Sequence, residues 1–154
     1  MTDQQALSVL YVEDYALGIA LMRDALARRA PHIRLDVAST VAHAIDKLHP
    51  AQDSAYDVVL TDLDLPDGSG LDILEHIRSR NLRVAVVILS GSNPEETVSG
   101  AKLAAADGYL TKRGDYVAQV PTVLHAALAR FRSRTGSAPG QSAWAEDPAP
   151  PKPK

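Results

Sequence analysis

The sequence contains no cysteine, and this absence excludes two kinds of site. Without thiol groups the chain forms neither a disulfide framework nor a cysteine-ligated zinc site. Long apolar runs are also missing, since no stretch approaches the roughly 20 apolar residues that a membrane-spanning helix needs. Residues 1–12 lack the basic segment and the long apolar segment of a signal peptide. We therefore expect a soluble, cytoplasmic protein that makes no contact with a membrane.

An excess of positive charge is absent too. The chain carries 16 lysines and arginines against 19 acidic residues, a net charge of -3, so it offers no basic surface for nucleic acid. Its 154 residues, 45% hydrophobic and 23% charged, are typical of one globular domain that is large enough to bury a core. We expect that domain over residues 1–134, followed by a disordered Pro/Ala/Ser-rich tail over 135–154.

Short apolar segments alternate along the chain with segments of helical spacing. The strands are predicted at 7–12, 33–38, 57–61, 84–89 and 108–111, and the helices at 17–30, 41–48, from the cap Ser69 onward, 94–106 and 121–134. This alternation predicts an α/β fold with a doubly wound, five-stranded parallel sheet. Right-handed crossovers then place the carboxyl ends of all strands at one edge of the sheet.

The predictions of the first and the last helix depend on particular residues. In the first helix the apolar spacing is carried by Leu17, Leu21 and Leu26. The last helix is expected to begin at Pro121, because proline suits a first helical turn, after a loop over 113–120.

The most informative stretch is YDVVLTDLDLPDGSGLDIL, residues 56–74. Its apolar run ends abruptly at Thr61-Asp62, and an acidic, Pro/Gly-rich turn follows. This pattern is typical of a buried parallel strand with a carboxylate at its tip. In open α/β sheets that tip is where ligands bind.

Other chemically active side chains follow the remaining predicted strands. They are Glu13-Asp14, Ser90 and Lys112. Three carboxylates at one edge repel one another unless a hard cation such as Mg²⁺ lies between them. A metal ion, a lysine and a hydroxyl group around Asp62 would suit a phosphoryl group that this carboxylate attacks.

In this order, the segments around Glu13-Asp14, TDLDLPDGSG, VVILSGS and GYLTK resemble the receiver domain of bacterial two-component response regulators over residues 7–134. The resemblance implies a flavodoxin-like (βα)5 fold with strand order 2-1-3-4-5. It also implies Mg²⁺-dependent transfer of a phosphoryl group to Asp62 from a sensor histidine kinase or a histidine phosphotransfer protein. The chain would then be a phosphoryl acceptor capable of self-dephosphorylation rather than an enzyme.

The same resemblance assigns further roles. The metal ligands would be Glu13, Asp14, Asp62 and the backbone carbonyl of Asp64. The switch residues would be Ser90 and Tyr109, which remodel the face made by the helix at 94–106, the strand at 108–111 and the last helix. A downstream protein target would bind this face. We also expect a homodimer through it, with Phe131 near the exposed end of the last helix.

The chain departs from the family pattern at two positions. Arg113 follows Lys112 where the family usually has proline, so the cis peptide bond of the family is not expected here. Asp64 adds a carboxylate beside Asp62, and we hypothesise that it alters the lifetime of the aspartyl phosphate by acting on the attacking water. Dephosphorylation of Asp64→Asn tests this hypothesis, and an unchanged rate would refute it.

Several alternatives stay open at this stage. About twenty residues follow Arg134, which favours a stand-alone receiver, but the Pro-rich tail also fits an N-terminal receiver cut from a larger regulator. The Asp62-Leu63-Asp64 sequence after a strand resembles a phosphatase of the haloacid dehalogenase type. A pseudo-receiver that works without phosphorylation is a third alternative.

The five histidines predict no site. They are His32, His43, His49, His76 and His125. None of them has metal-ligand spacing with another along the sequence.

Overall fold

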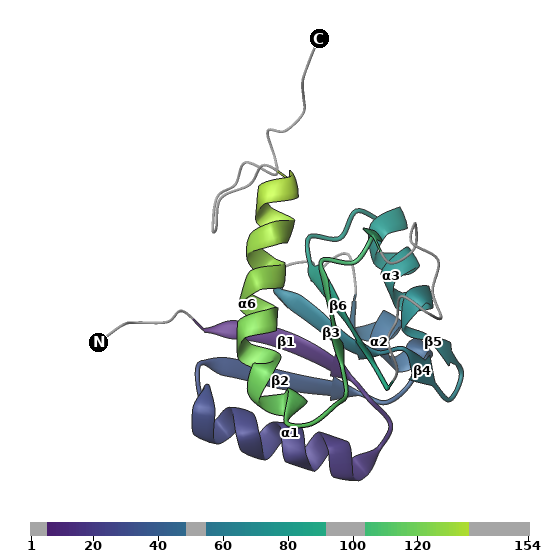
Figure 1. Cartoon of the computed structure of the whole chain (residues 1–154). Helices are drawn as coiled ribbons and strands as arrows, with labels where there is room; N and C mark the ends of the chain where they lie inside the picture. Colours follow the sequence, from purple (N-terminus) through teal and green to yellow (C-terminus); the bar gives the residue numbers. More distant parts are fainter. Residues whose placement is uncertain (1–5, 49–54, 92–103, 136–154) are drawn as a thin grey trace.

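A five-stranded parallel sheet forms the centre of the computed structural model, which describes residues 6–48, 55–91 and 104–135. Its strands are β1 (Leu7–Val12), β2 (Ile33–Ala38), β3 (Val58–Asp62), β6 (Ala85–Ser90) and β7 (Gly108–Thr111) (Figure 1). They lie in the order β2-β1-β3-β6-β7 with every pairing parallel. Counted along the chain, this is the predicted order 2-1-3-4-5. The predicted fold class is confirmed.

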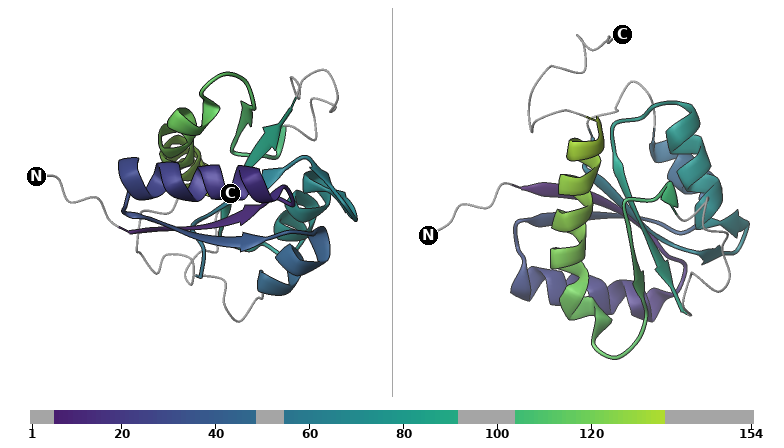
Figure 2. Two further views of the ribbon diagram at one scale, coloured as in Figure 1. Left: turned by 90° about the horizontal axis from the view of Figure 1, so that it is seen from below. Right: turned by 45° about the horizontal axis from the view of Figure 1, so that its top comes forward.

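Helices cover both faces of the sheet. Their bounds are α1 (Ala16–Arg29), α2 (Val41–Lys47), α3 (Gly70–Ser79) and α6 (Tyr116–Thr135). Figure 2 shows α1 and α6 on one face and α2 and α3 on the other. Two separate hydrophobic clusters correspond to these two interfaces. Because β3 and β6 are buried along their whole length, their continuous apolar sequences are those of a sheet covered on both sides.

Side-chain caps fix where α2 and α3 begin. Thr40 accepts a hydrogen bond from the His43 amide at the start of α2, across 3.0 Å. Ser69 and Asp72 form a capping box at the start of α3, which confirms the predicted cap. Each cap satisfies amide groups that have no partner inside the helix.

The acidic turn after β3 is more ordered than the sequence indicates. It forms an antiparallel hairpin of β4 (Asp64–Leu65) and β5 (Gly68–Ser69). The Asp67 carboxylate accepts hydrogen bonds from the amides of Val41 at 2.7 Å and Ala42 at 3.0 Å. These bonds lower the pKa of Asp67. The hairpin is thereby tied to the beginning of α2.

The buried face of α1 does not coincide with its row of leucines. Gly18, Met22 and Leu26, spaced four residues apart, face the core. Leu17 and Leu21 are 55% and 54% exposed. They lie one position from the buried row, and one position turns a side chain about 100° around a helix axis. The predicted helix is confirmed, but of the three leucines that carry its apolar spacing only Leu26 faces the core.

The last helix also begins earlier than predicted, at Tyr116 rather than Pro121. Val120 is buried, and Tyr116 and Val117 pack against the core, so this segment gains apolar contacts by being helical. Pro121 removes one intrahelical hydrogen bond, the one its missing amide would donate to the carbonyl of Val117. Gly114, at φ +55°, turns the chain into the helix in the left-handed conformation that glycine adopts without strain.

Phe131 is 5% exposed and lies in the core, although it stands near the end of the last helix. The guanidinium groups of Arg78 and Arg134 lie 5.8 Å and 5.5 Å from its ring centre. Both arginines also bond to the buried carboxylate of Asp107. A homodimer, if formed, cannot use Phe131 as a contact residue.

The predicted helix over 94–106 lies largely outside the described residues, and so does the predicted tail beyond Thr135. The described residues contain no cis peptide bond. Among the described helices, none combines the length and the apolar composition needed to cross a membrane.

Candidate functional site

Three carboxylates meet at the carboxyl edge of the sheet. Asp62 is the last residue of β3, and Glu13 and Asp14 directly follow β1, the strand beside it. One carboxylate oxygen from each residue lies within 4.8 Å of the other two. Glu13 and Asp62 are buried and Asp14 is exposed. The fold thus brings together the three acids that the sequence singles out.

Lys112 enters the same space from the end of β7. Its ammonium group lies 2.9 Å from Oε1 of Glu13 and 3.3 Å from Oδ2 of Asp62. The backbone holds it in place, because the Lys112 amide donates a 2.7 Å hydrogen bond to the carbonyl of Ser90. Ser90 ends β6 and is itself buried. All of these strand-end residues therefore converge on one edge, as predicted.

The electrostatics of Asp62 reflect this crowding. Burial and the nearby charge of Glu13 raise its pKa to about 6, although Lys112 acts in the opposite direction. Burial alone would lower the pKa of Lys112, but the bond to Glu13 and the charge of Asp62 outweigh it and raise that pKa. The ammonium group therefore stays charged, while Asp62 holds its proton more tightly than an ordinary aspartate.

Glu13 has further partners that the sequence did not predict. The hydroxyl of Tyr11, a fully buried residue of β1, donates to Oε1 of Glu13 across 3.3 Å. The Tyr15 amide donates to Oε2 across 3.2 Å. Burial and then the charge of Glu13 raise the pKa of Tyr11, so it remains a protonated donor. In the sequence, the presence of a tyrosine among the apolar residues of β1 could have indicated this contact.

Gly70, the first residue of α3, is a second residue that sequence reasoning missed. A Cβ atom at this position would lie 2.5 Å from the carbonyl oxygen of Asp62 and 3.1 Å from the side chain of Thr61. The Thr61 hydroxyl donates to that same carbonyl across 2.9 Å. Close approach of α3 to the backbone of Asp62 thus requires glycine. In the sequence, a glycine at the end of the turn could have indicated this close approach.

The remaining predicted residues occupy different environments. Tyr109 in β7 is 41% exposed, with its side chain at the surface. Asp64 is exposed in the β4–β5 hairpin, and its carboxylate is not part of the described acidic cluster. The roles of Ser90 and Tyr109 as switch residues, and of the Asp64 carbonyl as a ligand, stay predictions.

The donor set suits a hard divalent cation. Three carboxylates supply oxygen ligands only, which is the preference of Mg²⁺. Burial and the charge of Glu13 raise the pKa of Asp62, and a cation bound beside it would favour its ionised form. Glu13, Asp14 and Asp62 therefore fit a magnesium ion chemically.

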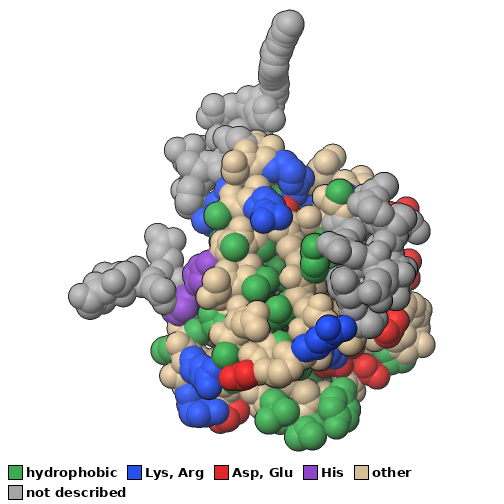
Figure 3. Space-filling model, in the orientation of Figure 1, with side chains coloured by type: hydrophobic (Ala, Val, Ile, Leu, Met, Phe, Trp, Pro, Cys, Tyr) green, Lys and Arg blue, Asp and Glu red, His purple; other side chains and the backbone are tan. Residues whose placement is uncertain are grey.

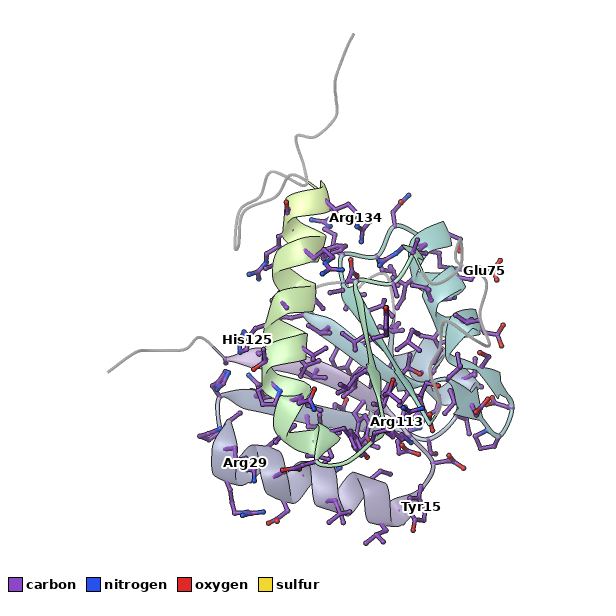
Figure 4. All side chains as sticks on the ribbon, viewed as in Figure 1. Tyr15, Arg29, Glu75, Arg113, His125 and Arg134 are labelled. Carbon is purple, nitrogen blue, oxygen red and sulfur yellow. The ribbon has the colours of Figure 1, made fainter. Side chains whose placement is uncertain are left out.

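An apolar surface borders this site. Tyr15, Leu17 and Leu21 are 60%, 55% and 54% exposed at the beginning of α1. We call them the α1 apolar patch, and Figure 3 shows hydrophobic side chains gathered at this edge of the molecule. In Figure 4, Tyr15 and Arg113 lie at the same end of the molecule, near the strand tips.

Comparison with known proteins identifies relatives of this arrangement. A sequence profile of the response regulator receiver domain matches residues 9–120. The chain is 30% identical over 112 residues to the nitrate/nitrite response regulator protein NarL of Escherichia coli, covering 73% of this chain and 50% of NarL. The chain spans about half the length of the curated relatives it matches.

Solved structures resemble it as well. The signal receiver domain of a putative Luxo repressor protein from Vibrio parahaemolyticus superposes with a TM-score of 0.70 at 22% identity, covering 84% of this chain and 95% of that chain. The response regulator protein TrrA from Thermotoga maritima, in complex with Mg²⁺-BeF, gives a TM-score of 0.64 at 22% identity, covering 78% and 98%. At these identities the similarity establishes the fold.

Proposed function

The chain belongs to the response regulator receiver domain family, and on that premise we propose that Asp62 accepts a phosphoryl group from a phosphohistidine. The donor would be a sensor histidine kinase or a histidine phosphotransfer protein, acting in the cytoplasm. The observation that carries this proposal is the arrangement of Asp62, with Lys112 at 3.3 Å and two further carboxylates beside it. The family works as a phosphoryl-accepting switch rather than as a classical enzyme.

In the proposed step, a carboxylate oxygen of Asp62 forms a bond to phosphorus while the phosphorus–nitrogen bond of the donor breaks. The imidazole leaves with the electron pair. Lys112 neutralises a phosphoryl oxygen, and the Ser90 hydroxyl donates a hydrogen bond to another. In self-dephosphorylation, water attacks the phosphorus and the Asp62 carboxylate is the leaving group.

Glu13, Asp14, Asp62 and the carbonyl of Asp64 would hold Mg²⁺. When bound, the ion neutralises charge on phosphoryl oxygens. The TrrA structure holds Mg²⁺ together with a beryllium fluoride, which supports testing the same pair of reagents on this chain.

The output would be a change of protein contacts. Ser90 moves toward the phosphoryl group and Tyr109, now 41% exposed, turns inward behind it. This change alters the face formed by β7 and α6 and, with it, the binding of a downstream protein target. A stand-alone receiver would signal through this face directly, and a receiver within a longer regulator would signal through it to the rest of that protein.

The donor would dock on the α1 apolar patch. A phosphohistidine must come within bonding distance of Asp62, so the protein that carries it covers the adjacent surface. Tyr15 bonds through its amide to Glu13, which places the patch directly beside the acidic site. Exposed apolar side chains in that position suit the apolar face of a partner helix.

Intact-mass measurement after incubation with acetyl phosphate and Mg²⁺ tests the proposal. We expect a gain of one phosphoryl group that Asp62→Asn abolishes. Asp46→Asn, at an exposed position of α2, is the matched control and should be labelled normally. Labelling that persists in Asp62→Asn contradicts the proposal. Multiple turnover of phosphate esters would indicate a phosphatase, and no labelling by any donor would indicate a pseudo-receiver.

A further inference from the structure

Two histidines that lie 93 positions apart in the sequence meet at the surface. Nε2 of His32 and Nε2 of His125 are 2.9 Å apart. The ring planes are inclined by 23° and the ring centres are 5.1 Å apart. The distance between the ring centres thus exceeds the distance between the two Nε2 atoms by about two ring radii, so the ring centres and the two nitrogens lie nearly on one line. The imidazoles therefore meet edge to edge through their Nε2 atoms rather than face to face.

The backbone supports this pairing from both sides. His32 precedes β2, and its carbonyl accepts a 2.9 Å hydrogen bond from the Leu7 amide at the start of β1. His125 projects from the middle of α6 (Figure 4). Both side chains are near the surface, and Figure 3 shows histidine side chains exposed beside α6. The pair lies at the amino edge of the sheet, opposite the edge that carries Asp62.

A contact of this length requires one neutral nitrogen to accept the proton of the other. Burial and the neighbouring His32 lower the pKa of His125. The His125 ring is therefore uncharged near neutral pH. The imidazole that carries its proton on Nε2 can move it to Nδ1, with no net loss of protons. Both Nε2 lone pairs then become available to a ligand.

We propose that His32 and His125 form a surface site for a divalent transition-metal ion of the copper, nickel or zinc class. Imidazole nitrogen is a preferred ligand of these ions, whereas Mg²⁺ prefers oxygen. With metal–nitrogen bonds of about 2.0–2.1 Å, nitrogens at the present separation subtend an angle of about 90° at the metal, the cis angle of square-planar and octahedral ions. From the edge-to-edge arrangement, each ring must turn by about 45° to aim its Nε2 lone pair at the ion, a movement that the surface position of the pair permits.

The site offers two protein ligands, and water completes the coordination shell. Within the described residues, no third histidine, aspartate or glutamate joins this pair in a cluster of metal-ligating atoms. The bound ion would cross-link the start of β2 to α6. Because the ion binds the folded state, it should raise the unfolding temperature, and above the dissociation constant the rise should follow the logarithm of the ion concentration. This site is independent of the proposed phosphoryl chemistry.

Nickel titration of the full chain tests the site. Excess Mg²⁺ and the Asp62→Asn background, which removes one of the three carboxylates, should weaken competing Ni²⁺ binding at the acidic cluster. We expect calorimetry to give one bound Ni²⁺ per chain and an increase in the unfolding temperature. In NMR spectra, substoichiometric Ni²⁺ should broaden the ring signals of His32 and His125 before those of His43 and His76.

Single variants assign the ligands. His32→Ala and His125→Ala should each lose the calorimetric signal and the thermal shift. His43→Ala, at an exposed position of α2, should retain both. Circular dichroism checks that each variant is folded. Unchanged Ni²⁺ binding in His125→Ala, or no binding by the unaltered chain, would overturn the proposal.

Discussion

Lys112 donates a hydrogen bond from Nζ to Oε1 of Glu13 across 2.9 Å, although 99 positions separate the two residues in the sequence. The same oxygen accepts from Tyr11, and the same ammonium group lies 3.3 Å from Asp62. Glu13 thus holds Lys112 in a position from which its ammonium group also reaches Asp62, the proposed phosphoryl acceptor.

Replacement of this lysine should slow phosphorylation. Lys112→Ala leaves two buried carboxylates without their positive partner and removes a donor to the phosphoryl oxygens, so we expect a loss in rate of about 10²-fold. The measurement is the rate of labelling by acetyl phosphate at saturating Mg²⁺. Lys47→Ala, which removes a surface contact to Asp36, is the control. An unchanged rate in Lys112→Ala would contradict the assigned role.

Asp62 should make stability depend on pH. Its pKa is about 6 in the folded chain and about 3.9 in an unfolded chain, so its contribution is fully present below about pH 4 and lost as the pH rises through 6. In metal-free buffer, Asp62→Asn should therefore raise the free energy of unfolding at pH 8, by up to about 3 kcal/mol. The gain should vanish near pH 4.

Urea denaturation with a chelator at both pH values measures this difference. Mg²⁺ should remove part of it at pH 8, because the ion stabilises the ionised carboxylates of the unaltered chain. Asp46→Asn, at an exposed position of α2, is the matched control. An equal stability difference at the two pH values would show that ionisation of Asp62 is not the cause.

Two glycines beside the site should differ in their tolerance of an added methyl group. In Gly70→Ala the new Cβ lies 2.5 Å from the Asp62 carbonyl, so α3 or the tip of β3 must move. We expect a loss of about 1–3 kcal/mol in stability and slower labelling by acetyl phosphate. In Gly91→Ala the Cβ meets nothing within 4 Å, and both quantities should stay near their original values. Equal effects of the two changes would refute the packing argument.

The elements that sequence predicts well are those with local causes. The apolar runs that become β1, β3 and β6 are buried on both faces, and the polar residues at their ends follow directly. Because parallel strands have their carboxyl ends at one edge of the sheet, the sequence alone predicts that Asp62, Glu13 and Lys112 lie close together. The cap at Ser69 was equally visible, since a capping box is a short sequence pattern.

What sequence missed depends on contacts between distant segments. The spacing of the leucines predicts helix α1 but not its buried face, which consists of Gly18, Met22 and Leu26. The beginning of α6 was placed at Pro121 because tertiary packing of Val120 is invisible to local propensity. The contact of His32 with His125 joins residues 93 positions apart and needs the fold itself. Tyr11 and Glu13 are an exception, because they lie two positions apart at the end of β1 and share one face of the strand.

Tyr11 should support the metal-binding geometry of Glu13 from the core. Tyr11→Phe removes the hydroxyl that donates to Oε1 and keeps the ring, so we expect a stability loss of about 1 kcal/mol. Mg²⁺ affinity should fall as well, because Glu13 loses one of the donors that hold it. Tyr56→Phe, which removes a hydroxyl bonded to Asp36, should lower stability without changing Mg²⁺ affinity. Equal Mg²⁺ affinity in the two variants would show that Tyr11 is structural only.

The α1 apolar patch should matter to a protein donor but not to a small one. Leu17 and Leu21 are more than half exposed, so Leu17→Glu and Leu21→Glu should leave the fold and acetyl-phosphate labelling unchanged. Transfer from a phosphorylated histidine protein should slow, because each charge must be desolvated at the interface. Ala27→Glu, at an exposed position near the far end of α1, is the matched control. Normal transfer to both leucine variants would place the donor on another surface, whereas loss of acetyl-phosphate labelling would point to the site itself.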